Sequence, residues 1–226
     1  MTRTAVIAGV GPGLGESIAR RFCEEGCTVG LFARSAEYID ALSTELGDDA
    51  LAVSTDVTDP AAVEAGFETV RAEFGPVDVL VNNASGGAWR GVRDISPEAF
   101  EEALDVSAYG GLLCSQTALP DMLDGDGGTI VFTGATSAIR GRDGAIGFSA
   151  AKFAARGMAE SMARELGPEG IHVAHVVIDG GIRSSESDDE KLLDPDAIAD
   201  SYWHLVTQDR SSWTLELDLR PHVESF

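Results

Sequence analysis

Short apolar runs alternate with longer stretches of helical periodicity along the whole 226-residue chain. Strand and helix in strict alternation favour a parallel sheet with helices on both faces, so this pattern constrains the fold more than any other feature. The predicted strands are Thr4–Ala8, Thr28–Ala33, Leu51–Ser54, Val77–Val81, Thr129–Thr133, His172–Ile178 and Trp213–Leu219. The predicted helices are Leu14–Glu25, Ala36–Leu46, Ala61–Phe74, Pro97–Met122, Ala145–Leu166 and Pro195–Thr207. We therefore expect an α/β fold with a doubly wound parallel sheet of about seven strands.

Three dipeptides mark where helices should begin. Asp59-Pro60, Ser96-Pro97 and Asp194-Pro195 each place a capping side chain before a proline that suits the first helical position. We find neither an internal repeat nor a linker, so the sequence predicts one domain over residues 1–226.

The balance of charge limits the partners of this chain. Thirty-eight Asp and Glu face sixteen Lys and Arg, for a net charge of −22 at pH 7. Such a chain repels phosphate backbones and anionic lipid surfaces, so we expect no nucleic acid and no membrane among its partners. The acid excess predicts a solvated acidic surface of the type that halophilic proteins carry.

The sequence gives no sign of export or of a metal site. No apolar run reaches the roughly 18 residues of a membrane-spanning helix, and the N-terminus enters a strand directly. Cys23, Cys27 and Cys114 are an odd and sparse set without a neighbouring histidine, and we interpret them as core thiols. The prediction is a cytoplasmic protein without a bound metal.

A glycine-rich turn follows the first predicted strand and precedes the first predicted helix. Ligands of a doubly wound sheet bind beyond the carboxyl ends of its strands, and glycine lets the backbone approach a pyrophosphate closely. The second strand then ends at Arg34, a cation that suits a 2′-phosphate better than a ribose diol. We therefore predict a nicotinamide dinucleotide site that prefers NADP(H), with NAD(H) as the open alternative. The cofactor-binding residues of the turn are Gly9, Gly11, Gly13, Leu14 and Gly15.

Three later segments extend this pattern into a family resemblance. Ser54-Thr55-Asp56-Val57, Asn82-Asn83-Ala84-Ser85 and Phe148-Ser149-Ala150-Ala151-Lys152 come in the order of the motifs of the short-chain dehydrogenase/reductase family, which the chain resembles over nearly its whole length. The resemblance implies a Rossmann-like NAD(P)-binding domain and an oxidoreductase acting on a carbonyl or alcohol. It also implies further cofactor contacts, namely Asp56, Val57, Asn83, Ala84, Ser85 and Lys152.

The departures from the family pattern fall where the chemistry should be. Phe148 occupies the position of the tyrosine that moves the hydroxyl proton, Ala135 that of the serine and Ser107 that of the asparagine. Only Lys152 of the four remains, so the chain resembles a divergent subgroup with phenylalanine in place of tyrosine. We expect either an enzyme with an atypical proton route or, as the alternative, a weak or inactive NADP-binding protein that acts as a cofactor sensor or interaction subunit.

A few other side chains are candidates to replace the missing proton donor. Thr136 and Ser137 follow the fifth strand and could polarise a carbonyl, so they join Lys152 as the predicted catalytic residues. Tyr109 is expected to pack in the core. His172 and His175 are three residues apart on one strand, and this odd separation directs them to opposite faces of the sheet. We expect both to be structural.

Arginines gather on the loops that should surround the cofactor. We predict a small-molecule substrate that is anionic, held partly by Arg90, Arg140 or Arg142, because cations at one sheet edge attract anions. Trp89 and Phe148 could add apolar contact. The family resemblance further implies a homodimer or homotetramer. The arginines of these loops are Arg34, Arg90, Arg93, Arg140, Arg142 and Arg183.

Overall fold

The computed structural model describes residues 2–87, 89–184, 187 and 189–224. Within these residues, seven parallel strands form one sheet in the order β3-β2-β1-β4-β5-β6-β7. The expected doubly wound parallel sheet is therefore confirmed. The strands are β1 (Thr4–Ala8), β2 (Thr28–Ala33), β3 (Ala50–Ser54), β4 (Val79–Asn82), β5 (Gly128–Thr133), β6 (Ile171–Ile178) and β7 (Glu216–Leu219).

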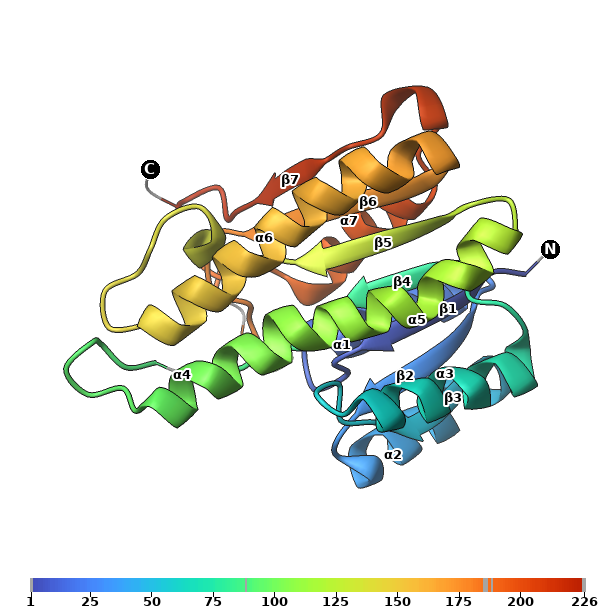
Figure 1. Cartoon of the computed structure of the whole chain (residues 1–226), viewed down its shortest axis with the longest axis horizontal. Helices are drawn as coiled ribbons and strands as arrows, with labels where there is room; N and C mark the ends of the chain where they lie inside the picture. The colour runs from blue at the N-terminus through green and yellow to red at the C-terminus, as the bar shows by residue number, and fades with distance from the viewer. Residues whose placement is uncertain (1, 88, 185–186, 188, 225–226) are drawn as a thin grey trace.

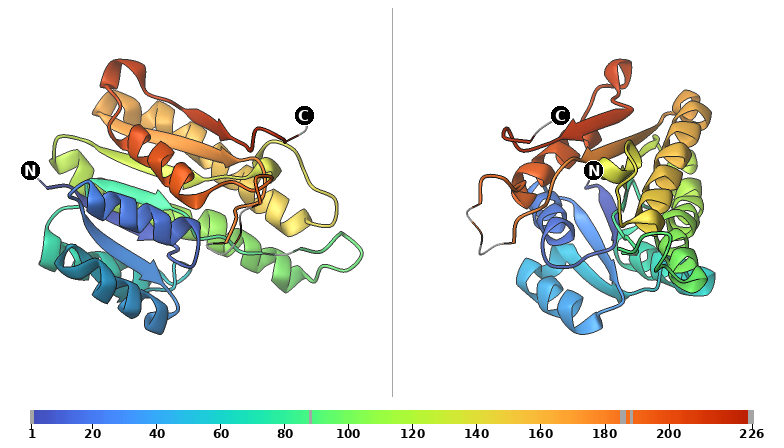
Figure 2. Two further views of the ribbon diagram at one scale, coloured as in Figure 1. Left: turned by 180° about the vertical axis from the view of Figure 1, so that it is seen from behind. Right: turned by 90° about the vertical axis from the view of Figure 1, so that its left-hand side faces the viewer.

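Helices cover both faces of the sheet, so the molecule has three layers (Figures 1 and 2). On one face α1, α2 and α7 pack over a core that includes Ile18, Ile39 and Tyr202; on the other, α3, α5 and α6 cover Phe67 and Met122. No helix in the described part of the chain has the length and apolarity to cross a membrane. The helices are α1 (Leu14–Glu24), α2 (Ala36–Leu46), α3 (Pro60–Phe74), α4 (Pro97–Leu104), α5 (Gly110–Asp124), α6 (Ile146–Leu166) and α7 (Pro195–Val206).

The three predicted helix starts are confirmed by their caps. The Asp59 side chain accepts a hydrogen bond from the backbone N–H of Ala61 at 2.9 Å, as Asp194 does from that of Asp196 at 3.1 Å. The Ser96 hydroxyl accepts a hydrogen bond from the backbone N–H of Ala99 at 3.2 Å. Each cap satisfies an amide of the first turn that has no partner within the helix.

One predicted helix is interrupted in the structure, and one predicted strand begins three residues later than expected. The helix expected over Pro97–Met122 consists of α4, a π-helical turn over Asp105–Tyr109, and α5, which continues to Asp124. The last strand begins at Glu216 instead of Trp213, because a 3-10 turn over Arg210–Ser212 precedes it and the Trp213 indole stacks on the ring of His172. The remaining boundaries agree within two residues.

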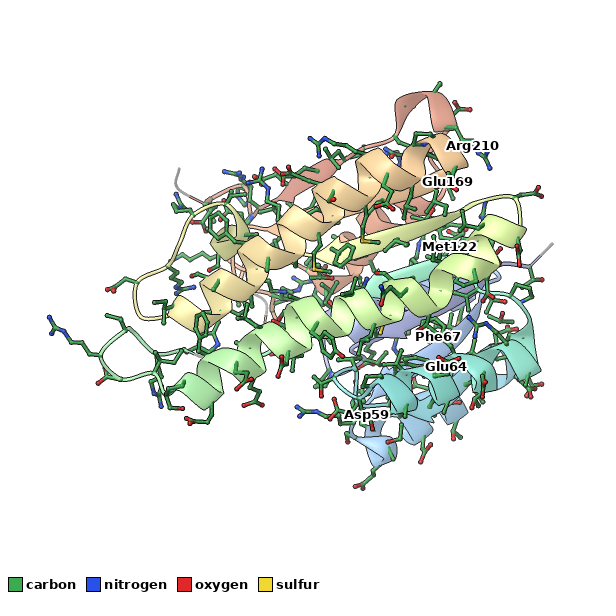
Figure 3. All side chains as sticks on the ribbon, viewed as in Figure 1. Asp59, Glu64, Phe67, Met122, Glu169 and Arg210 are labelled. Atoms are coloured by element: carbon green, nitrogen blue, oxygen red, sulfur yellow. The ribbon has the colours of Figure 1, made fainter. Side chains whose placement is uncertain are left out.

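The strand order fixes where a ligand can bind. From β1 the chain proceeds outward to β2 and β3, then returns to add β4 on the other side of β1, so loops leave β1 and β4 in opposite directions. A crevice opens at this switch point beyond the carboxyl ends of the strands. The arrowheads of the strands point to that edge in Figure 1, whereas Glu169 and Arg210 lie at the opposite edge in Figure 3.

Candidate functional site

A cavity of about 1530 Å³ lies at the carboxyl edge of the sheet. The loops that follow β1, β4, β5 and β6 line it, together with the first turns of α1, α6 and α7. Four segments far apart in the sequence therefore face one space. This is the crevice that the strand order predicts.

Two glycines of the turn after β1 are required by close backbone contacts. A Cβ atom on Gly9 would lie 2.3 Å from the backbone nitrogen of Ala84, and one on Gly15 would lie 2.6 Å from the carbonyl oxygen of Gly9. At Gly11 and Gly13 an added Cβ would meet nothing within 4 Å, so their backbone borders open space. The turn is thus pressed against the loop after β4 on one side and open to the cavity on the other.

The start of α1 supplies the electrostatics of this turn. Gly13 is the N-cap residue and offers no side-chain cap, so Leu14 and Gly15 begin the helix at the wall of the cavity. The amide groups and the dipole of a helix N-terminus favour a phosphate. The nearby Glu16 carboxylate is already bound by Arg20 at 2.7 Å and by the hydroxyl of Tyr38.

The loop after β4 holds the glycine turn in place. The Asn83 side chain donates a hydrogen bond to the Gly9 carbonyl at 2.7 Å, and the backbone N–H groups of Asn83 and Ala84 both donate to the Ala8 carbonyl. Ser85 follows as an exposed residue of the cavity wall. The structure therefore brings these predicted residues together with the glycine turn.

A smaller cavity of about 290 Å³ holds Arg34 and Asp56. The carboxylate of Asp56 accepts hydrogen bonds from the backbone N–H and the hydroxyl of Thr58, and these bonds, with the charge of Arg34, lower its pKa. Val57 instead packs against Gly110. The Val57 side chain is 8% exposed and lies outside the lining of both cavities. Arg34 and Asp56 thus share a surface, whereas Val57, a predicted cofactor contact, lines neither cavity.

Lys152 is a buried cation at the wall of the large cavity. It is 3% exposed and its Nζ donates a hydrogen bond to the Thr133 carbonyl at 2.7 Å. Loss of hydration on burial lowers its pKa from 10.5 to about 8. A charged ammonium with a single protein acceptor has donor capacity left for a ligand, because an ammonium carries three N–H donors.

Phe148 lies in an aromatic stack on the same wall. The ring of Trp89 stacks on it with centroids 4.7 Å apart, and the Arg142 guanidinium lies over the Trp89 ring at 5.2 Å. Lys152 Nζ lies 5.6 Å from the Phe148 centroid. Phe148, which the family resemblance predicts at the position of a tyrosine, thus presents an apolar ring near Lys152.

The hydroxyl of Thr136 makes a short hydrogen bond at this wall. It donates to a carboxylate oxygen of Asp179 at 2.6 Å, and both residues line the cavity together with Ser137. Asp179 is 5% exposed and lies 4.0 Å from Arg140 and 3.5 Å from Arg220. Sequence reasoning missed Asp179, although it directly follows β6 in one of the loops where ligands bind.

Three further polar side chains near the site have other surroundings. The Ser107 hydroxyl accepts a hydrogen bond from the Gly86 N–H at 3.3 Å, and that of Ser149 accepts one from the Arg142 N–H at 3.1 Å. The expectation of a core position for Tyr109 is wrong, since it is 43% exposed, on the π-helical turn before α5.

The two histidines occupy opposite faces of β6, as expected. Both ring nitrogens of His172 lie within hydrogen-bonding distance of backbone carbonyls, of Leu205 and Thr214. His175 Nδ1 contacts Glu216, while its buried Nε2 packs beneath Gly134 without a hydrogen-bond partner among the described residues. Burial lowers the pKa of both histidines.

Only some of the arginines predicted near the cofactor lie at the large cavity. Arg140, Arg142 and Arg183 line the large cavity, and Arg183 pairs with the carboxylate of Asp194. Among the described residues of the lining, neither Arg90 nor Arg93 occurs.

Comparison with known proteins places this geometry in a family. The sequence model of the short chain dehydrogenase family matches residues 3–191. The chain is 36% identical over 171 residues to oxidoreductase asL5 of Sarocladium schorii, covering 76% of this chain and 69% of that one.

Two solved structures share the whole architecture. A 3-ketoacyl-(acyl-carrier-protein) reductase from Brucella melitensis, complexed with NADH, superposes with a TM-score of 0.89 at 28% identity over 97% of both chains. A metagenomic short-chain oxidoreductase in complex with NADP gives 0.86 at 27% identity over 98% of both. With its glycine turn, buried lysine and seven-stranded sheet, this chain belongs to the short-chain dehydrogenase family of oxidoreductases.

Proposed function

We propose that this protein is an NADP(H)-dependent oxidoreductase that interconverts a carbonyl compound and an alcohol. The observation that carries the proposal is the single cavity that joins the uncapped start of α1 to buried Lys152. The similar structures that contain NADH and NADP support the assignment of a nicotinamide cofactor.

The residues of the cavity fit such a cofactor. The open backbone at Gly11 and Gly13 leaves room for a pyrophosphate at the helix N-terminus, and Lys152 Nζ is free to donate to a ribose hydroxyl. Asn83 and Ser85 line the same cavity, Ala84 lies between them in the chain, and Asp56 lies beside Arg34 in the smaller cavity. When bound, the nicotinamide accepts or supplies the hydride.

The preference for NADP(H) rests on Arg34. Its guanidinium is exposed at the end of β2 and faces the smaller cavity, where it can pair with a 2′-phosphate. NAD(H) remains the alternative cofactor, and the ratio of the two dissociation constants decides between them.

The proton route differs from the family's. Phe148 has no titratable proton, so Thr136 and Ser137 are the hydroxyl groups left beside Lys152 to orient a substrate oxygen. The substrate is a small molecule, and Arg140 and Arg142 at the mouth of the cavity favour an anionic one. Trp89 offers it an apolar face.

A second function is favoured by the aromatic stack. Because Phe148 and Trp89 pack together where a proton donor is expected, the chain could bind cofactor without fast turnover and act as a sensor or interaction subunit. Fluorescence titration with NADPH, followed by turnover of aldehydes and ketones with and without a carboxylate, separates the two. Binding with turnover supports the enzyme, whereas binding without turnover of any panel member supports the sensor.

We further propose a single domain over residues 1–226 that assembles into a homodimer or homotetramer in the cytoplasm. Exposed apolar side chains at the start of α5 and on α6, namely Tyr109, Leu112 and Phe153, offer a surface for assembly. The free thiols of Cys23, Cys27 and Cys114 suit a reducing compartment.

A further inference from the structure

We propose that Thr136 and Asp179 form a proton relay that replaces the missing tyrosine, with Thr136 contacting the substrate oxygen and Asp179 acting through it. The inference rests on the proposed function and deepens it, because it assigns the atypical proton route. Thr136 is then the catalytic hydroxyl, and Asp179 is a positioning residue that also receives the proton.

The direction of the hydrogen bond between the two residues suits this role. The Thr136 hydroxyl donates to Asp179 Oδ1 at 2.6 Å, a distance within the range of bonds from a hydroxyl to a carboxylate. Its proton is thus held by Asp179, which leaves its oxygen lone pairs to accept from a substrate hydroxyl. A lone serine or threonine would lack this fixed orientation.

The surroundings of Asp179 make it a built feature of the cavity wall. A carboxylate that is 5% exposed needs compensation, and Arg220 at 3.5 Å and Arg140 at 4.0 Å supply it. The backbone N–H of Asp179 also donates to the Leu219 carbonyl at 2.8 Å, which ties the residue to the end of β7. These contacts hold the carboxylate against Thr136.

The other candidate proton donors have different partners, and Ser107 and Ser149 lie outside the lining of the cavity. Lys152 Nζ donates to the Thr133 carbonyl, the Ser107 hydroxyl accepts from Gly86, and the Ser149 hydroxyl accepts from Arg142. The ring of His175 lies behind Gly134, inside the sheet layer. Among the described residues of the lining, Thr136 is therefore the one whose hydroxyl donates to a carboxylate.

The relay balances in both directions. In alcohol oxidation a bound nicotinamide would take the hydride as the carbinol C–H bond breaks, and the O–H electron pair would become the second bond of the carbonyl. The substrate proton moves to Thr136 Oγ1 while the hydroxyl proton of Thr136 moves to Asp179 Oδ1, from which it leaves to solvent. Carbonyl reduction reverses each transfer, so Asp179 then delivers a proton through Thr136 to the developing alkoxide.

The first readout needs no cofactor. In the ¹H NMR spectrum of the protein alone, the hydroxyl proton held between Thr136 and Asp179 should give a downfield, slowly exchanging resonance. It should vanish in Thr136→Val and shift in Asp179→Asn, and it should persist in Asp218→Asn. Asp218 is the matched control because it is also a carboxylate that pairs with Arg220, but its recorded hydrogen bonds and ion pairs do not include Thr136. A spectrum unchanged by Thr136→Val would overturn the pairing.

The second readout is turnover of the panel carbonyl that the wild type reduces fastest. Thr136→Val and Asp179→Asn should each lower kcat about 100-fold, with KM and the NADPH dissociation constant changed less than about 3-fold. Thr136→Ser keeps the hydroxyl and should retain activity within about 5-fold, as should Asp218→Asn. Because Thr136→Val leaves every charge in place, it tests the relay even where Asp179→Asn does not fold.

The outcomes separate this proposal from the proposed function. Absence of turnover in the wild type overturns the function and the relay together. Wild-type turnover that survives in Thr136→Val overturns the relay alone, and so does a loss that appears only in KM.

Discussion

The indole of Trp89 stacks on the ring of Phe148, with their centroids 4.7 Å apart and their planes at 25°. Arg142 lies over Trp89 and Lys152 lies near Phe148, so two cations and two aromatic rings form one column along the cavity wall. Phe148 within this column is the residue that the family resemblance predicts at the position of the reactive tyrosine.

Phe148→Tyr should restore a second proton donor beside Lys152. General acid catalysis contributes about 10²–10⁴-fold, so we expect kcat for carbonyl reduction to rise at least about 10-fold. The measurement is the rate of NADPH oxidation across the carbonyl panel. Phe153→Tyr, on the same helix and 45% exposed, is the matched control and should leave the rate unchanged. An unchanged rate in Phe148→Tyr would show that the phenol does not reach the substrate.

Arg34→Ser should weaken the binding of NADPH and spare that of NADH. Removing a charge-assisted contact to a 2′-phosphate costs enough to raise the NADPH dissociation constant about 10-fold. Fluorescence titration of both cofactors measures the two constants. The control is Arg93→Ser, outside the lining of the cavities, and equal weakening of both cofactors by Arg34→Ser would contradict the assignment.

Lys152 should make stability depend on pH above neutrality. Its pKa is about 8 in the folded protein and about 10.5 when unfolded, so between these values the unfolded chain binds the extra proton and the contribution of Lys152 to stability improves as pH rises. Lys152→Met should therefore exceed the wild type by roughly 3 kcal/mol in unfolding free energy at pH 7, a difference that shrinks through pH 8 to 10.5.

Urea unfolding of both proteins at each pH measures this difference. The subtraction removes the opposing titration of Cys27, whose pKa is raised to about 11 in the fold by burial and so destabilises the protein at high pH. A difference between Lys152→Met and wild type that is constant with pH would rule out a buried, titrating ammonium.

Gly9→Ala should destabilise the fold more than Gly13→Ala. Both glycines have a positive φ, of 106° and 102°, so the backbone strain is matched, but only the Cβ on Gly9 collides with Ala84. We expect Gly9→Ala to lower the unfolding free energy by about 2 kcal/mol more than Gly13→Ala. Equal losses in urea unfolding would mean that the two loops can separate at little cost.

Phe153→Glu should disrupt the proposed assembly. A charge in the middle of an apolar contact is costly, so light scattering after size-exclusion chromatography should give a lower mass for this variant than for the wild type. Glu160→Gln, further along α6, serves as the control. A monomeric wild type would overturn the proposed homodimer or homotetramer.

The fold was predictable because strand and helix alternate with clear punctuation. The caps at Asp59, Ser96 and Asp194 mark helix starts through local chemistry that a sequence displays directly. The π-helical turn at Asp105–Tyr109 was not predictable in this way, because it adds one residue per turn without interrupting the apolar pattern.

Only the part of the site that depends on backbone conformation was predictable from the sequence. Glycine at positions 9 and 15 is read directly from the sequence, because close approach requires it. The Thr136–Asp179 pair joins residues 43 positions apart, and its charge compensation comes from Arg220 on yet another strand end. Such contacts depend on side-chain placement in three dimensions, which no spacing rule provides.

The position of β7 has a consequence for biosynthesis. Arg220 follows this last strand and is the guanidinium nearest to Asp179, yet it lies beyond residues 3–191, which match the family. A nascent chain emerges N-terminus first, so the glycine turn, Lys152 and Thr136 all leave the ribosome before it. The buried carboxylate of Asp179 therefore has no contact with Arg220 until β7 has been synthesised and has paired with β6. The charge balance of this wall is therefore reached only after β7 joins the sheet, and a product that stops before β7 would fold around an incomplete site.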